Sequence, residues 1–195
     1  MATAFVLGNG VSRQAVDLNQ LRSLGKIYGC NALYRDFAPD VLVATDRPIA
    51  TEIQNSGYPI KNKFYTRKPI ENLGALKVPH DYYGYSSGPL ATAIAAMDQH
   101  HLIYMIGFDM GPVNNNKFNN IYADTDFYRK SDATPVYTGN WTRQIRKICE
   151  DFPKTQFVRV QGKTTADIAE FANIKNLRHL PIHTFLDRIN NQKDL

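Results

Sequence analysis

Short apolar segments that end at a glycine, asparagine or aspartate recur along this chain, with helix-like segments between them. The segments are TAFVL (3–7), KIYGC (26–30), PDVLVAT (39–45) and HLIYMIGFD (101–109), and the polar or glycine positions at their ends are Gly8, Asn31, Asp46 and Asp109. Nearly continuous apolar strands that alternate with helices are typical of a parallel sheet covered on both faces. In such a sheet, ligands bind beyond the carboxyl ends of the strands, where the strand order reverses.

The remaining segments complete an α/β pattern. Further strands are predicted at 63–67 and 156–160, and helices at 12–24, 48–56, 86–100 and 140–152, with a helical tail from Thr164 onward. Ser12 is the predicted N-cap of the first helix. The segment 69–85 is a predicted loop, and 110–137, rich in asparagine and glycine, is predicted as a long lid-like loop. We predict one Rossmann-like domain over residues 1–195, with a mostly parallel sheet and helices on both faces.

Composition narrows the class of protein. The chain is 43% hydrophobic, which argues against disorder, and no apolar run approaches the length of a membrane span. Two isolated cysteines, Cys30 and Cys149, and no leader-like start fit a cytoplasmic protein. The net charge of +5 is spread along the chain, which suits a small anionic ligand better than nucleic acid. The oligomeric state is left open, a homo-oligomer included.

The turn Gly8-Asn9-Gly10 after the first strand suggests a nucleotide site. Glycines let a backbone approach a phosphate closely, and the following helix offers free N–H groups. A dinucleotide fingerprint, however, needs a third glycine where this chain has Arg13, and an acidic residue where it has Asn31. The amides of Asn9 and Asn31 can both donate and accept, so we predict that they bind a ligand side by side. The alternative is that they are turn residues.

Three motifs resemble a known family. The segments VLGNGVSRQAVDL, IYGCNALYRD and SSGPLATAIAAMDQHHLIYMIGFDM are similar, in the same order, to bacterial sialyltransferases of the CstII type and their often phage-encoded relatives. The resemblance implies a nucleotide-sugar glycosyltransferase that uses a CMP-activated donor, or another nucleotide-activated one, without a required metal or cofactor. For a phage protein, the compartment would be the host cytoplasm.

The resemblance also implies site residues. Asn9 and Gly10 would contact the donor phosphate and sugar, Asn31 the nucleotide, and Ser86, Ser87 and Gly88 the donor sugar. With the strand-end positions, the predicted ligand-binding set is Gly8, Asn9, Gly10, Ser12, Asn31, Asp46, Ser86, Ser87, Gly88 and Asp109.

The chain departs from the family at the general base. The family has a histidine in Tyr-x-Gly-His, where this sequence has Tyr137 and then Asn140, and an asparagine cannot take a proton at neutral pH. The general base is left open, and the catalytic candidates are His80, as a displaced base, and the motif residues Tyr137 and Asn140. An alternative function is a catalytically silent protein that sequesters or senses a nucleotide.

A metal-dependent function is the remaining alternative. In a pyrophosphokinase-like relative, Asp109 and Asp124 would bind magnesium, and Asp124 with Asp126 forms a D-x-D pair. Because this pair lies in a polar loop without a strand before it, we predict solvated acids there and nucleotide binding that needs no metal.

Overall fold

The computed structural model describes residues 2–191, and its centre is an eight-stranded sheet in which all neighbouring strands are parallel. The order is β5-β4-β3-β2-β1-β6-β7-β8. The strands are β1 (Thr3–Leu7), β2 (Lys26–Cys30), β3 (Val41–Val43), β4 (Lys63–Thr66), β5 (Leu76–Lys77), β6 (Leu102–Ile106), β7 (Gln156–Gln161) and β8 (Leu177–Pro181). From β1 the strands β2 to β5 follow toward one edge of the sheet, and β6 to β8 follow toward the other. The strand order therefore reverses between β1 and β6, which places the predicted switch point at the centre of the sheet.

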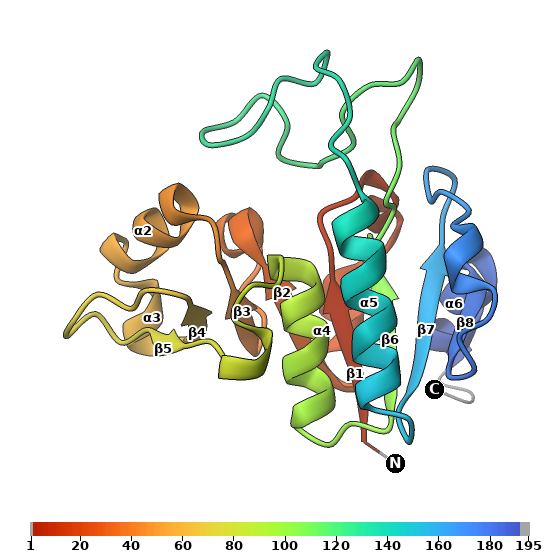
Figure 1. Cartoon of the computed structure of the whole chain (residues 1–195), viewed down its shortest axis with the longest axis horizontal. Coiled ribbons are helices and arrows are strands. Elements are labelled where there is room, and N and C mark those ends of the chain that lie inside the picture. Colours follow the sequence, from red (N-terminus) through yellow and green to blue (C-terminus); the bar gives the residue numbers. More distant parts are fainter. Residues whose placement is uncertain (1, 192–195) are drawn as a thin grey trace.

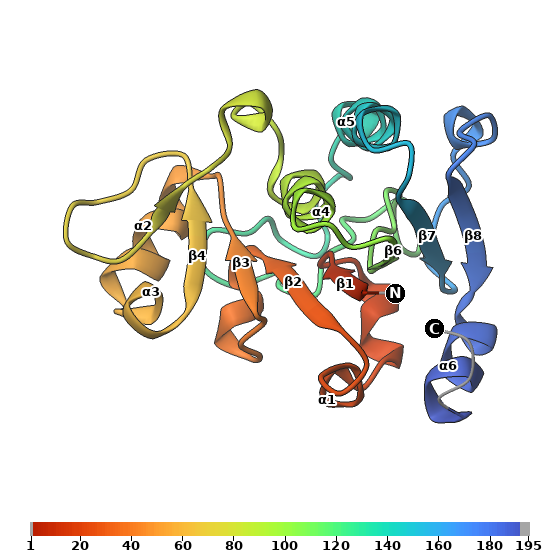
Figure 2. The ribbon, with the colours of Figure 1, turned by 90° about the horizontal axis from the view of Figure 1, so that it is seen from below.

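Helices cover both faces of the sheet, so the predicted fold class is confirmed (Figure 1, Figure 2). On one face lie α4 (Ser87–Met97) and α5 (Gly139–Asp151), and on the other lie α1 (Leu18–Leu21) and α6 (Ile182–Asn191). The helices α2 (Arg47–Asn55) and α3 (Tyr58–Lys61) lie toward the β4–β5 end of the sheet. In residues 2–191, no helix is both long enough and apolar enough to cross a bilayer.

Burial explains the two central helices. In α4 nearly every residue is buried, which matches its alanine-rich sequence, because a helix that is apolar on all sides must be enclosed. The helix α5 instead has one buried stripe, which includes Ile145 and Ile148, and it packs against α4. Together they form the core of one face.

The predicted helix 12–24 is wrong. The segment forms a 3₁₀ turn over Val11–Ala15 and the short helix α1, whose N-cap is Asp17 and not Ser12. The side chain of Asp17 accepts a hydrogen bond from the N–H of Asn19, as a capping aspartate does. The hydroxyl of Ser12 is not free for capping, because it donates to Asp109, which lies in the turn after the neighbouring strand β6.

The predicted helical tail is also wrong in part. After β7 the chain forms a 3₁₀ turn at Ala169–Phe171 and then the edge strand β8, and up to residue 191 the one α-helix of this segment is α6. The loop at 69–85 likewise contains the two-residue strand β5. Both missed strands lie at the edges of the sheet. An edge strand has a neighbouring strand on one side only, so its apolar pattern is weak.

The segment 110–137 is irregular, as predicted. It contains no helix or strand apart from an isolated bridge between Val113 and Lys117, and it projects above the carboxyl ends of the strands (Figure 1). Its middle is anchored, however. The N–H of Ile121 donates to the carbonyl of Asn9, and the N–H of Ala32 donates to the hydroxyl of Tyr128. That it moves when a ligand binds stays a prediction.

The glycines of the first turn serve close packing. A Cβ on Gly8 would lie 2.6 Å from the carbonyl oxygen of Gly107, and a Cβ on Gly107 would lie 2.6 Å from that of Gly8. Gly107 also has a left-handed backbone, with φ of 75°. The turns after β1 and β6 are therefore in backbone contact, and the N–H of Gly10 donates to the carbonyl of Gly107.

We expect Gly8→Ala to destabilise the fold by about 1–3 kcal/mol, since both backbones would have to move apart. The matched control is Gly84→Ala. A Cβ there meets nothing within 4 Å, and no positive φ constrains it. Urea titration of both variants tests this, and equal stability of the two variants would contradict it.

Candidate functional site

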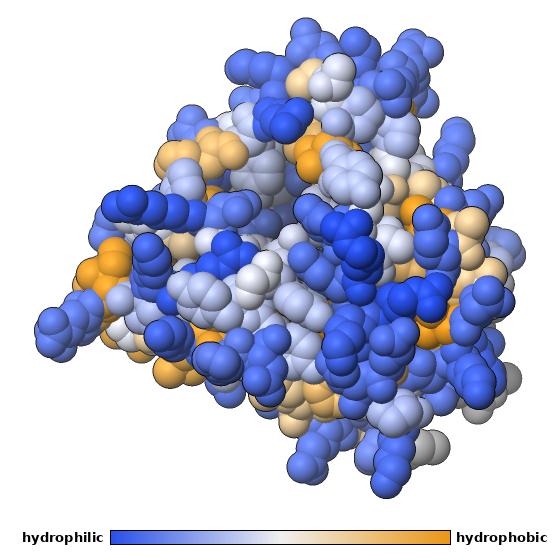
Figure 3. Space-filling model, viewed as in Figure 1, coloured by the Kyte–Doolittle hydropathy of each residue, from blue (hydrophilic) through white to orange (hydrophobic). Residues whose placement is uncertain are grey.

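A pocket of about 330 Å³ opens at the carboxyl ends of β1, β2, β3 and β6, beneath the segment 110–137. The space-filling view shows it as a recess below that segment (Figure 3). This volume is within the range of small-ligand sites. Its lining residues are Gly8, Asn9, Gly10, Cys30, Asn31, Thr45, Asp46, Arg67, Ser86, Ser87, Gly88, Pro89, Gly107, Phe108, Asp109, Met110, Gly111, Phe118, Asn119, Asn120, Pro135, Val136, Thr138 and Trp141.

Of the predicted ligand-binding residues, all except Ser12 line this one pocket. Asn9, Asn31 and Asp46 follow different strands, and the parallel sheet brings them to the same edge. Their convergence is a finding about geometry, and their contact with a ligand stays a prediction.

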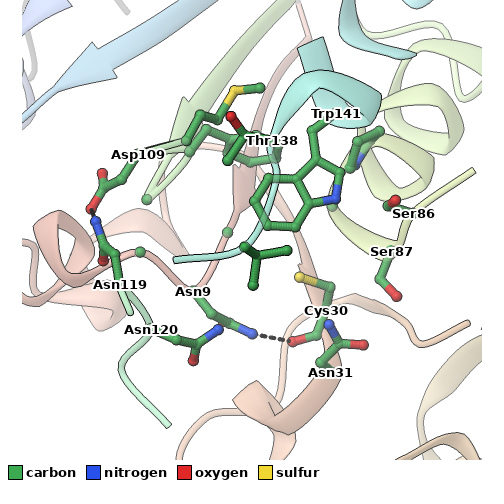
Figure 4. Close-up of a pocket in the computed structure, with 18 of the residues that line it drawn as sticks. Asn9, Cys30, Asn31, Ser86, Ser87, Asp109, Asn119, Asn120, Thr138 and Trp141 are labelled. Atoms are coloured by element: carbon green, nitrogen blue, oxygen red, sulfur yellow. Dashed lines mark hydrogen bonds between the residues drawn. The ribbon is translucent and has the colours of Figure 1, made fainter. Parts of the chain in front are cut away.

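The amide of Asn9 ties β1 to β2. Its Nδ2 donates to the carbonyl of Cys30 at 3.1 Å, and its Oδ1 accepts from Nη1 of Arg13 at 2.6 Å (Figure 4). The residue is buried and is not among the residues with positive φ. Its amide is thus largely engaged by the protein, and the side chain holds the two neighbouring strand ends in place.

The backbone donors after Asn9 are also engaged. The N–H of Val11 donates to Oδ1 of Asn119 at 2.9 Å, and the N–H of Ser12 donates to Asp109 at 3.0 Å. The N–H of Gly10 is hydrogen-bonded to the carbonyl of Gly107. This turn has the sequence position of a Rossmann phosphate loop but offers few free N–H donors. A phosphate would therefore find few free donors at this turn.

Asp109 joins four segments. Its carboxylate accepts from the hydroxyl and N–H of Ser12, from Asn119 at 3.1 Å, from Thr164 at 2.7 Å and from Thr165 at 3.0 Å. It is 2% exposed. With its oxygens so well satisfied, this carboxylate has a structural role beside the predicted ligand-binding one.

Asn31 differs from Asn9 in having an unused acceptor. Its Oδ1 is buried and has no hydrogen-bond partner among residues 2–191. Its backbone is left-handed, with φ of 54°, a conformation that asparagine tolerates better than most residues. A buried carbonyl oxygen without a partner is costly, so this atom is suited to a donor on a ligand.

The start of α4 forms another part of the pocket. The hydroxyl of Ser87 lies 3.0 Å from the N–H of Thr45 and accepts from it, which fixes α4 to the end of β3. The N–H of Ser86 donates to Gln144 of α5. No described residue accepts from the N–H of Ser87 or Gly88 through a backbone bond, and both residues line the pocket at the positive end of the helix.

Two charged side chains flank this region. Arg67 donates to the carbonyls of Tyr83 and Tyr85, both at 2.8 Å, and is the one cation among the described lining residues. Asp46 is exposed at the rim, and its side chain does not cap α2. A phosphate beside Arg67 and the start of α4 would be well balanced in charge.

None of the catalytic candidates lines the pocket. The imidazole of His80 is fully exposed, Tyr137 is 72% exposed, and Asn140 is exposed with its Oδ1 bonded to Arg143. Cys30 does line the pocket, but burial raises the pKa of its thiol to about 12, so it is neutral at pH 7.

The acidic pair of the loop lies outside the pocket. Asp124 has φ of 68°, and its carboxylate accepts from the N–H of Ser131 at 2.9 Å, which is a turn-forming role. The Ser131 hydroxyl and, to a smaller extent, this backbone bond lower the pKa of Asp124. Among residues 2–191 no group of three or more His, Cys, Asp or Glu side chains could hold a metal ion.

Sequence reasoning missed Arg67 and Trp141. Arg67 lay at the end of a predicted strand, and nothing local distinguishes it from a surface arginine. Trp141 is the single tryptophan of the chain and follows the position of the expected base, which could have drawn attention to it.

No protein-family model matches this sequence, and no curated protein matches it either. Among solved structures, the chain is similar to the sialyltransferase CstII from Campylobacter jejuni, described in complex with a substrate analogue, cytidine-5'-monophosphate. The TM-score is 0.50 at 14% identity, over 91% of this chain and 85% of that one. The two proteins share the architecture of a parallel sheet covered by helices. At this identity the likeness concerns the fold alone.

We expect Asn9→Ala to lower the free energy of unfolding by about 1–3 kcal/mol, because Arg13 loses an acceptor inside the protein. Asn9→Gly should be no more stable than Asn9→Ala, since the backbone of Asn9 does not need glycine. Thermal melting of both variants checks this, and a glycine variant as stable as the wild type would contradict it.

Proposed function

We propose that this chain binds a nucleotide sugar in the pocket and transfers its sugar, and that the donor carries CMP or another nucleotide. The observation that carries the proposal is the unpartnered Oδ1 of Asn31, a residue that lines a ligand-sized pocket at the switch point of the sheet. A small rotation of the Asn31 side chain would bring this buried oxygen to the pocket surface, where an amino or hydroxyl group of a nucleoside would satisfy it. The glycosyltransferase-like fold supports the same ligand class.

The phosphate is assigned to the start of α4. The free N–H groups of Ser87 and Gly88 and the guanidinium of Arg67 supply positive potential there, while the turn after β1 has few donors left. A phosphate held in this way needs no divalent ion to offset its charge.

Asp46 is the general base of the proposed transfer, by elimination among the lining residues. The Asp109 carboxylate is used by the protein, the Cys30 thiol is neutral, and Arg67 cannot accept a proton. The Asp46 carboxylate would take the proton from an acceptor hydroxyl. The hydroxyl oxygen attacks the anomeric carbon, whose bond to the phosphate oxygen breaks, and the nucleotide leaves with that electron pair.

A catalytically silent nucleotide-binding protein is the second candidate function. It is favoured by the exposed position of Asn140, which leaves the pocket without the base that the resemblance predicts. The two functions share the nucleotide site and differ only in turnover.

Nucleotide binding is tested with CMP, UMP, AMP and GMP and their sugar conjugates. We expect at least one to raise the melting temperature, because a ligand at about 100 times its Kd adds about 2.7 kcal/mol of stability. The shift should persist in EDTA. Loss of the shift on chelation, restored by magnesium, would contradict the assignment to Arg67 and α4, and no shift with any ligand would overturn the proposal.

Turnover is tested with Asp46→Asn. Loss of a general base should slow release of the nucleotide from the donor by roughly 10²- to 10⁴-fold. Binding of the same donor, measured by calorimetry, should be unchanged or tighter, because a negative charge leaves the rim. Equal turnover in both proteins would exclude Asp46 as the base, and none in the wild type with any donor would favour the silent protein.

A further inference from the structure

The indole of Trp141 reaches into the pocket from the start of α5. Figure 4 shows it opposite Asn9, Cys30 and Asn31, with its nitrogen on the side of Ser86. Its other side packs against the hydrophobic core, so the ring is partly buried and held in place. It is the largest side chain that lines the pocket.

Helix geometry selects Trp141 over its neighbour. The buried stripe of α5 passes through Thr142, Ile145 and Ile148, which fixes the rotation of the helix about its axis. Successive residues of an α-helix are about 100° apart, so Asn140 is turned to solvent when Trp141 faces the pocket. The expected base position is thus outside, and an aromatic ring takes its place.

The surroundings leave this ring available to a ligand. No residue drawn in Figure 4 accepts a hydrogen bond from its Nε1–H. Phe108 and Val136 line the same pocket and add apolar surface, while the amides of Asn9 and Asn31 are polar. A buried indole commonly finds a partner for its N–H, and an exposed face of an aromatic ring is a stacking platform.

We infer that Trp141 is a ligand-binding residue whose indole stacks on a ring of the bound nucleotide sugar. The inference rests on the proposed function and assigns to the pocket a specificity for ligands that present a flat or apolar ring face. Two rings have that chemistry: the nucleobase, through its π face, and the sugar, through its C–H groups. The experiment separates them.

Trp141 is the only tryptophan of the chain, so tryptophan emission, excited selectively over that of the tyrosines, reports on the pocket alone. The probes are CMP, ribose 5-phosphate and CMP-N-acetylneuraminate, and binding of each is measured in parallel by calorimetry. A change of emission with CMP but not with ribose 5-phosphate places the base on the indole. A change with the sugar conjugate alone places the sugar there.

Two substitutions test the contribution to affinity. Trp141→Leu removes the ring and should weaken the binding of the probe that changes emission by roughly tenfold. Trp141→Phe keeps a ring, loses the N–H and should weaken binding less. The matched control is Phe152→Leu, which removes an aromatic side chain that packs against the same core just after α5 and does not line the pocket. It should leave affinity unchanged.

Binding by calorimetry with unchanged emission, and equal affinity of Trp141→Leu and the wild type, would overturn the stacking role and leave the proposed function standing. Absence of binding for every probe and every nucleotide tested above would overturn both.

Discussion

The carboxylate of Asp109 is the point at which the segments around the pocket meet. It accepts hydrogen bonds from the turn after β1, from the irregular loop and from the two threonines that follow β7. Beneath it, the fully buried Arg159 donates to the carbonyls of Phe108 and Asp109, at 2.9 and 3.0 Å. Burial lowers the pKa of Arg159 to about 10, so it remains charged at pH 7. Charge-assisted hydrogen bonds of this kind hold the irregular segments around the pocket in one arrangement. No regular strand or helix does so here.

This arrangement decides what the glycine turn is for. Gly8, Gly10 and Gly107 allow the turns after β1 and β6 to touch, and Asn9 then joins β1 to β2. The donors that a dinucleotide-binding loop would offer to phosphate are consumed in making these contacts. The positive potential available to an anion lies instead at the start of α4 and at Arg67, on the β3 side of the pocket.

The same logic applies to α5. Its apolar stripe determines which residues of its first turn face the pocket, and that stripe is set by packing against α4 and the core. Because of this packing, the ring of Trp141 lines the pocket, and Asn140, at the position where a base was expected, does not. The chemistry of the pocket becomes that of amides, hydroxyls and apolar surface, with one guanidinium, Arg67, and one exposed carboxylate, Asp46.

The sequence by itself determined the class of the fold. The apolar segments at 3–7, 26–30 and 101–109 are long enough and apolar enough to be central parallel strands, and their polar ends had to meet at one edge because all strands point the same way. It therefore also indicated nine of the lining residues, Asn9 and Asn31 among them. Local pattern failed at the segment 12–24 and at β8, where long-range hydrogen bonds and edge pairing override a helical spacing. Only the tertiary structure decided that the Asp109 carboxylate is occupied by hydrogen bonds within the protein and that Asn140 points away from the pocket. It also decided that Trp141 and Arg67 line the pocket. These outcomes depend on which groups far apart in the sequence come within hydrogen-bond distance, and no spacing along the chain encodes that.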